Sequence, residues 1–286
     1  CKTFLSSFIG NGMALLETLH KSAELIKNSK RMLLLTSAGM SADSNIPTFR
    51  DKDGYWKNFP PFKEKNLEAQ DLASPWAFRN ALPHAWAFYE WRRRNAHENQ
   101  PHTGYQIINE WFENCEGFIH TTNTDGLHLM SGCDKNRILE VHGSMWRLQC
   151  LDTCTHQFWD DVSVPLCNLD NHTMKASNFP SCTQCHGIAR PHILMFGDGE
   201  YTGHPEQEIN FKKFLQEPVD LAILVGSSGA VPTNDYIALH LQDKGTAVIN
   251  INLDPASNQI VNTDLFVEMK GKDAFVELNR IAFGKS

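Results

Sequence analysis

The segment LLLTSAGMSADSNIPTFRDKDGYW, residues 33–56, decides the fold. An apolar run from Leu33 to Leu35 ends in a turn of small residues around Gly39, and a polar loop follows. A strand that leads into such a loop is typical of an open α/β fold that binds a nucleotide. The usual dinucleotide fingerprint requires three glycines as G-x-G-x-x-G, but this loop has only one. Three interpretations follow: a degraded Rossmann turn, another kind of nucleotide site, or an ordinary junction between a strand and a loop.

The rest of the chain alternates helical patterns with short apolar strands. Helices are predicted over 11–28, over 74–99 with a break at Pro83, and over 103–114, and strands over 117–123, 219–228 and 246–252. This alternation favours a parallel sheet with crossover helices. Residues 150–187 lack periodicity and look like an inserted module. We therefore expect an α/β fold in which a Rossmann-like domain of residues 1–149 and 188–286 carries a small module of residues 150–187.

Composition excludes some classes of protein. The net charge of −7 provides no basic footprint for nucleic acid. No stretch approaches the roughly 20 apolar residues of a membrane span, so we expect no membrane partner either. The chain begins with Cys1, which suggests a processed or trimmed product, and its first ten residues do not resemble a secretory signal.

Eight cysteines suggest a metal site. Cys150 and Cys154 form one close pair, and Cys182 and Cys185 form a second pair within the same insert. Four thiolates in two pairs can close a tetrahedral shell around a structural zinc ion. The alternatives are scattered free cysteines, disulfides, or a shell in which Cys167 replaces one ligand. Clustered cysteines in a large chain favour metal and a reducing compartment, so we expect an intracellular, cytoplasmic protein, with the mitochondrion as the alternative.

Polar groups follow several of the predicted strands. Asn123 and Asp125 lie at the end of one predicted strand, and Gly226-Ser227-Ser228 lies at the end of another. His142 follows a third strand and directly precedes a glycine. Ligands of open α/β sheets collect at the carboxyl ends of the strands. These residues therefore predict one crevice, although each could separately be a turn residue or a buried histidine with its hydrogen bonds satisfied.

The sequence resembles the sirtuins, the Sir2 family of NAD-dependent protein lysine deacylases, from about residue 31 to residue 274. The resemblance rests on Ser37-Ala38-Gly39-Met40-Ser41 with Ser44, Ile46-Pro47 and Phe49-Arg50, on Thr122-Asn123-Thr124-Asp125, on His142-Gly143, on the two cysteine pairs, on Arg190-Pro191 through Phe196-Gly197-Asp198, on Gly226-Ser227-Ser228, and on Ile251-Asn252. The opening loop is thus similar to the family's nucleotide loop, in which one glycine and a long loop replace the three-glycine turn.

The chain departs from the family pattern at several positions. Ser37 stands where the first glycine is usual, Asn45 where a glycine precedes Ile-Pro, and Thr48 where an acid is common. Thr122 replaces the glutamine that is expected near the nicotinamide ribose, and Pro232 follows Gly226 one residue early. None of these changes removes a group that the chemistry requires.

The resemblance implies a role for each catalytic residue. His142 would be the base that takes a ribose hydroxyl proton while the acyl group moves from lysine to ADP-ribose and nicotinamide leaves. Asn123 would orient the ribose or a water molecule, and Asp125 would hold the nicotinamide carboxamide. Phe49 would shield the activated sugar from water, and Arg50 would face the phosphates and ribose.

The resemblance also implies the binding residues. The NAD contacts would be Ala38, Gly39, Ser41, Phe49, Arg50, Trp56, Thr122, Asn123, Asp125, Gly226, Ser227, Ser228, Asn252, Leu253 and Ala274. An acyl-lysine protein or peptide would lie between the two domains and add a strand beside Leu194, Phe196 and Gly197.

Tyr89 and Arg92 indicate which acyl group is removed. They are three residues apart, so they share a face of a helix. A guanidinium can bind a carboxylate through two parallel hydrogen bonds, to which a phenol can add a third. The Tyr-x-x-Arg pattern resembles that of sirtuins that prefer succinyl, malonyl or glutaryl groups. The alternative is that residues 92–94 are a solvated basic run while Tyr89 packs in an aromatic core.

Two other functions fit part of the sequence. A zinc-stabilised binding module without catalysis would not need His142, Asn123 and Asp125 together. An NAD glycohydrolase or an ADP-ribosyltransferase would use the same crevice, and Thr122 is compatible with it. A hydride-transferring dehydrogenase is disfavoured because the fingerprint glycines are missing.

Overall fold

A parallel sheet forms the centre of the larger lobe. The structure, a computed structural model, describes residues 2–48, 55 and 57–285. Within these residues six strands pair in the order β11-β10-β9-β1-β2-β3, and every pairing is parallel. The strands are β1 (Arg31–Thr36), β2 (Glu116–Thr121), β3 (Ile138–Glu140), β9 (Leu221–Val225), β10 (Ala247–Asn252) and β11 (Phe266–Glu268). The prediction of a Rossmann-like parallel sheet is confirmed.

The apolar run of β1 is explained by burial on both of its faces. Met32 and Leu34 belong to one hydrophobic core, whereas Leu33 and Leu35 belong to another. The first core packs against α1 (Lys2–Asn28), α8 (Thr103–Asn114) and α12 (Gly271–Phe283), and the second against α10 (Pro205–Phe214) and α11 (Thr233–Asp243). Successive side chains of a strand point to opposite faces, so a strand covered on both sides reads as a continuous apolar run.

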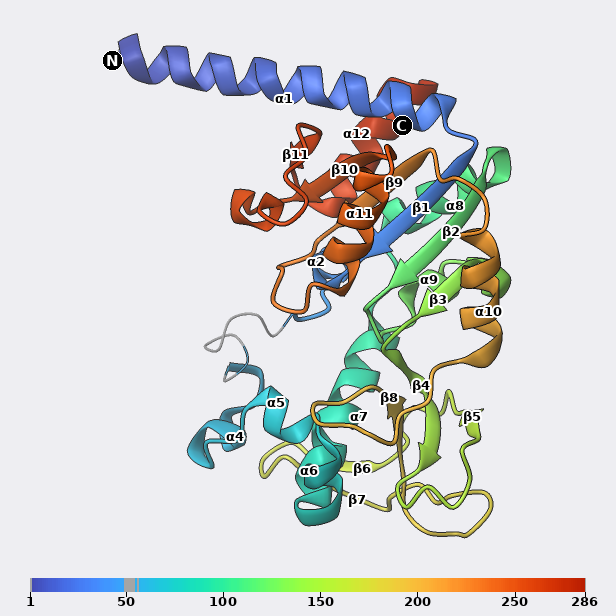
Figure 1. Cartoon of the computed structure of the whole chain (residues 1–286). Coiled ribbons are helices and arrows are strands. Elements are labelled where there is room, and N and C mark those ends of the chain that lie inside the picture. Colours follow the sequence, from blue (N-terminus) through green and yellow to red (C-terminus); the bar gives the residue numbers. More distant parts are fainter. Residues whose placement is uncertain (1, 49–54, 56, 286) are drawn as a thin grey trace.

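A second lobe lies beside the sheet (Figure 1). It contains α4 (Pro60–Glu64), α5 (Ala69–Leu72), α6 (Pro75–Asn80), α7 (Leu82–Glu98), β4 (Gly143–Cys150), β5 (Phe158–Asp160), β6 (Asn168–Asp170), β7 (Lys175–Ser177) and β8 (Ala189–Ile193). The strands form a β5-β4-β8 sheet and a β6-β7 pair. Its hydrophobic core joins Trp86 of α7 to Met145 and Ile193. The apolar contacts of the inserted module therefore extend beyond residues 150–187 and include α6 and α7.

The helices differ in detail from the prediction. The helix expected from residue 11 begins at Lys2, and its N-terminal end projects beyond the sheet in Figure 1. The break predicted at Pro83 falls at Ala81, which ends α6 and precedes α7. Pro83 lies in the first turn of α7, where a missing N–H costs no hydrogen bond. No helix among the described residues is both long enough and apolar enough to span a membrane.

The order of the strands creates a place for a ligand. The chain leaves β1 toward β2 on one side, and β9 lies against β1 on the other side. Loops that diverge from neighbouring parallel strands leave a crevice at the carboxyl ends of those strands. At this crevice the segment after Thr36 meets the segment after Val225.

Candidate active site

Two glycines bring the loops after β1 and β9 into direct contact. The N–H of Gly39, in α2 (Ala38–Ala42), donates to the carbonyl of Gly226 over 3.0 Å. A Cβ atom on Gly39 would lie 2.6 Å from Cα of Gly226, and Gly226 has a φ of +67°. Only glycine fits this contact and this backbone conformation. The floor of the crevice is therefore bare backbone, which a ligand can approach closely.

A cavity of about 770 Å³ opens above these glycines. It is lined by nine of the residues predicted to bind the cofactor: Ala38, Gly39, Thr122, Asn123, Gly226, Ser227, Ser228, Asn252 and Leu253. Its volume lies within the range of about 300–1,000 Å³ that is usual for ligand sites. Ser37, Asp43, Lys270 and Gly271 also line it, although they were not predicted to bind a ligand.

A second cavity, of about 720 Å³, adjoins the first. It is lined by the five predicted substrate residues Tyr89, Arg92, Leu194, Phe196 and Gly197, and also by Ser41 and Asp125. Thr122, Asn123 and His142 line both cavities. A ligand in one cavity would therefore meet a ligand in the other beside His142.

Six predicted cofactor residues are not among those that line the first cavity, and two of them, Ser41 and Asp125, line the second cavity instead. Ala274 is fully buried in the core formed by α12 and the sheet, and it lines neither cavity. Lys270 and Gly271, about one helical turn earlier, line the first cavity instead. The other three, Phe49, Arg50 and Trp56, lie outside the described residues.

Hydrogen bonds hold the predicted polar residues in place. Nδ2 of Asn123 donates to the carbonyl of Ser37 and to Oγ of Ser41, each over 3.0 Å. Oγ of Ser41 donates over 2.6 Å to the Asp125 carboxylate, which also accepts the N–H of Leu127. Burial raises the pKa of Asp125. Since the loop after β1 and the segment after β2 are bonded to each other, Asn123 and Asp125 have fixed positions.

His142 lies between β3 and β4, where the parallel sheet ends and the smaller lobe begins. Burial lowers the pKa of its imidazole, and a hydrogen bond to the backbone of Thr122 acts in the opposite direction. A lowered pKa keeps the ring neutral at pH 7, and a neutral imidazole can accept a proton. His142 therefore presents a neutral ring to both cavities.

The three arginines of α7 have three different environments. Arg93 is fully buried and donates to the carbonyls of Met145, Asp161 and Ser163. Arg94 pairs with Glu90 over 2.7 Å. Arg92 lines both cavities. The alternative for these residues is therefore wrong in its first half, the solvated basic run. Its second half is confirmed, because Tyr89 is buried in an aromatic core beside Phe78 and Phe88.

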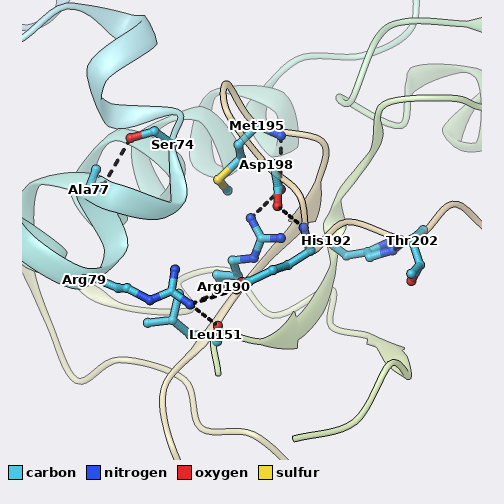
Figure 2. A network of polar contacts seen from close by, with 10 residues as sticks. Ser74, Ala77, Arg79, Leu151, Arg190, His192, Met195, Asp198 and Thr202 are labelled. Atoms are coloured by element: carbon cyan, nitrogen blue, oxygen red, sulfur yellow. Dashed lines mark hydrogen bonds and ion pairs between the residues drawn. The ribbon is translucent and has the colours of Figure 1, made fainter. Parts of the chain in front are cut away.

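The loop after β8 is held by a buried ion pair. Nη1 of Arg190 lies 2.7 Å from Oδ2 of Asp198, and both side chains are fully buried. Figure 2 shows this pair, together with the bond from the N–H of Met195 to the same carboxylate. The N–H of Phe196 donates to the carbonyl of Ala73, which ties the loop to the α5–α6 segment. The predicted substrate residues from 194 to 197 thus lie on a restrained segment.

The four predicted zinc ligands are close together. The sulfur atoms of Cys150, Cys154, Cys182 and Cys185 all lie within 4.8 Å of one another. Two of the sulfur-to-sulfur distances are 3.6 Å. Zn–S bonds of about 2.3 Å in a tetrahedron place sulfur atoms roughly 3.8 Å apart, so the cluster fits zinc. Cys167 is not part of it, because it is buried in the apolar core of the smaller lobe.

Comparisons with known proteins agree with this geometry. Residues 37–233 match the model of the Sir2 family. The chain is 31% identical to an NAD-dependent protein deacylase of Aeropyrum pernix over 242 residues, which cover 84% of this chain and 88% of that protein. It is 29% identical to one of Pyrococcus furiosus, with 91% and 96% covered. The solved structure of a Sir2 homologue in complex with NAD superposes with a TM-score of 0.74 at 27% identity, covering 92% of this chain and 93% of that one. The matched residues 37–233 include the cysteine cluster, the lining of the second cavity and most of the lining of the first, and the chain belongs to the Sir2 family.

Proposed function

We propose that this protein is an NAD-dependent protein lysine deacylase. The observation that carries the proposal is the position of His142 and Asn123, which line both the cavity at the carboxyl ends of the sheet and the cavity next to the β8 loop. Relatives that match most of the chain are NAD-dependent protein deacylases. A dinucleotide in the first cavity and an acylated lysine in the second would meet at these two residues.

The residues of the chain would divide the work as follows. NAD, when bound, would supply the ribose carbon that the acyl oxygen attacks as nicotinamide leaves, and the ribose hydroxyl on which the acyl group ends. His142, held neutral by burial, would accept the proton of a ribose hydroxyl. The bare backbone around Gly39 and Gly226 would let the phosphates approach closely, because neither residue has a side chain and both line the cavity. The zinc cluster would act only on structure, because four protein thiolates leave no open position on the metal.

The acyl group that we propose as the preferred substrate is an acidic one, such as succinyl or malonyl. Nη2 of Arg92 lies 3.3 Å from Oγ1 of Thr124, and its guanidinium carbon lies 5.4 Å from the centre of the Tyr89 ring. Burial lowers the pKa of Arg92 and raises that of Tyr89. A cation that has lost hydration gains more from a carboxylate than a solvated one does. Arg92 therefore favours a carboxylate at the end of the acyl chain.

The test compares acyl-lysine peptides in an assay that follows NAD, nicotinamide and peptide masses. The wild-type protein should turn over succinyl-lysine better than acetyl-lysine. Arg92→Met should lower kcat/KM for succinyl-lysine about 10- to 100-fold, because the loss of a charge-assisted hydrogen bond costs roughly 1.5–3 kcal/mol. Deacetylation should be unchanged or improved. Arg280→Met, which removes an exposed arginine that pairs with Glu277, is the control and should change neither activity.

Other results would assign the protein differently. A wild-type preference for acetyl-lysine, or an equal loss of both activities in Arg92→Met, would remove the acidic-acyl proposal and leave a deacetylase. Release of nicotinamide without any acylated peptide would favour an NAD glycohydrolase or an ADP-ribosyltransferase. No consumption of NAD under any condition would leave a zinc-stabilised binding module.

A further inference from the structure

A buried chain of hydrogen bonds runs under the floor of the first cavity. His120 of β2 and Asn234 of α11 are 2% and 0% exposed, and Nδ1 of His120 lies 2.7 Å from Oδ1 of Asn234. Nδ2 of Asn234 lies 2.8 Å from the carbonyl of Thr36 and 3.1 Å from Oγ of Ser37. Ser37 stands where the Sir2 pattern has glycine. A hydroxyl is thus added to the cavity at a position where the usual residue has no side chain.

The direction of each bond in this chain can be assigned. An amide nitrogen has two protons and accepts none, so Nδ2 of Asn234 donates both, to Thr36 and to Ser37. Oδ1 of Asn234 then requires a donor, which must be the Nδ1–H of His120. Burial lowers the pKa of His120 to about 4, so the ring is neutral and has one N–H to donate. Asn234 is therefore fixed in the orientation that presents a donor to Ser37.

Ser37 receives a second hydrogen bond from the other side. Oγ1 of Thr122 donates to Oγ of Ser37 over 3.1 Å, whereas the competing carbonyl of Thr36 lies 3.5 Å away. A hydroxyl has two acceptor positions and one proton. Asn234 and Thr122 occupy both acceptor positions of the Ser37 hydroxyl, so its proton remains available to donate a hydrogen bond. Ser37 lines the cavity together with Thr122, Asn123 and His142.

We propose that Ser37 is a dinucleotide-binding residue whose hydroxyl donates a hydrogen bond to an oxygen of NAD, and that Asn234 and His120 position it for this role. The inference rests on the proposed use of NAD and deepens it. Thr122 and Ser37 form a pair of polar residues in the lining of the first cavity, which His142 also lines. Asn234 and His120 touch no ligand themselves and act through Ser37.

The experiment measures the dissociation constants of NAD and ADP-ribose by calorimetry. Ser37→Ala should weaken binding of NAD about 3- to 10-fold, the usual effect of one lost hydrogen bond. Asn234→Ala should weaken it by a similar factor. In the Ser37→Ala background, Asn234→Ala should add less than twofold, because the two residues act on the same contact. A merely structural role of Asn234 would instead give additive losses.

Two further variants make the result decisive. Thr263→Val removes a buried hydroxyl that bonds to Val248, at the amino end of β10 and away from the cavity. It should leave both dissociation constants unchanged even if it lowers stability. Ser37→Gly restores the family residue and should resemble Ser37→Ala.

Binding of NAD by Ser37→Ala within twofold of wild type would overturn the assignment of Ser37 alone. Failure of the wild-type protein to bind either nucleotide would overturn the use of NAD as well.

Discussion

Single residues in this chain replace glycines of the family pattern without disturbing the backbone. Asn45 stands where a glycine usually precedes Ile-Pro, and its φ is +58°. Asparagine is among the few residues other than glycine that adopt this left-handed conformation at low cost. Ser37, by contrast, has an extended φ of −131° and needs no such tolerance. The first replacement preserves a turn, whereas the second adds a polar group to the cavity.

At the scale of the residue, His142→Ala should leave the fold intact and remove acyl transfer. The expected loss in kcat is about 10² to 10⁴-fold, which is typical for a general base. Circular dichroism checks the fold and nicotinamide release checks the activity. Near-normal turnover in the purified variant would contradict the assignment.

The pH dependence of the wild-type protein provides a second measurement of the same residue. The neutral imidazole is the active form, and burial lowers the pKa of His142. Activity should therefore be retained as the pH falls through the ordinary histidine range near 6.5 and be lost only below it. An acid limb of kcat/KM above this range would show that another group controls the activity.

Among the elements, the cysteine cluster joins the end of β4 to the segment before β8. Cys150 ends β4, and Cys182 and Cys185 precede β8. Between them, β6 and β7 form a short antiparallel pair. Small modules of this kind depend on bound metal for much of their folding free energy.

We predict one zinc per chain, which elemental analysis by mass spectrometry would measure. Cys182→Ala should lose the metal and lower the melting temperature, because three thiolates hold zinc less tightly than four. Cys167→Ala is the matched control. It deletes a buried sulfur outside the cluster, so it should keep full zinc occupancy. Loss of zinc in Cys167→Ala, with full occupancy in Cys182→Ala, would reverse the ligand assignment.

The whole molecule is organised around contacts between segments that are far apart in the sequence. In Figure 2, Arg190 and Asp198 pair next to the bond that Arg79 of α6 makes to the carbonyl of Leu151. Arg79 also pairs with Glu200 over 3.2 Å. These bonds connect α6, the start of the cysteine module and the loop after β8, and Asp198 of this loop lines the second cavity.

Asp198→Asn should destabilise the protein by roughly 3–5 kcal/mol, because Arg190 would remain as an uncompensated buried charge. The β8 loop should loosen, so KM for the acylated peptide should rise while the dissociation constant of NAD stays unchanged. Denaturant unfolding and steady-state kinetics measure the two effects. Glu200→Gln removes only the exposed pair with Arg79 and should cost less than about 1 kcal/mol. Equal costs in the two variants would argue against a structural role for the buried pair.

The sequence by itself determined the class of fold and most of the lining of the site. The apolar run Leu33–Leu35 predicted a strand buried on both faces, and the paired cysteines favoured a metal site. For the glycines after two strands, Gly39 and Gly226, the pattern left alternatives open, and the resemblance to the sirtuins selected among them. The ends of the parallel strands predicted one crevice, because ligands gather there, and the resemblance to the sirtuins supplied most of the individual residues that line the two cavities.

Other features were decided only by the tertiary structure. The three arginines of α7 look alike in the sequence, and only packing separates the buried Arg93 from Arg92 in the cavities. Ala274 was expected from the resemblance to bind NAD, but α12 places Gly271 at the cavity and Ala274 in the core. His120 and Asn234 are 114 positions apart and share no motif. Their hydrogen bond exists because β2 and α11 pack against each other, and no local pattern records which distant polar groups will be buried together.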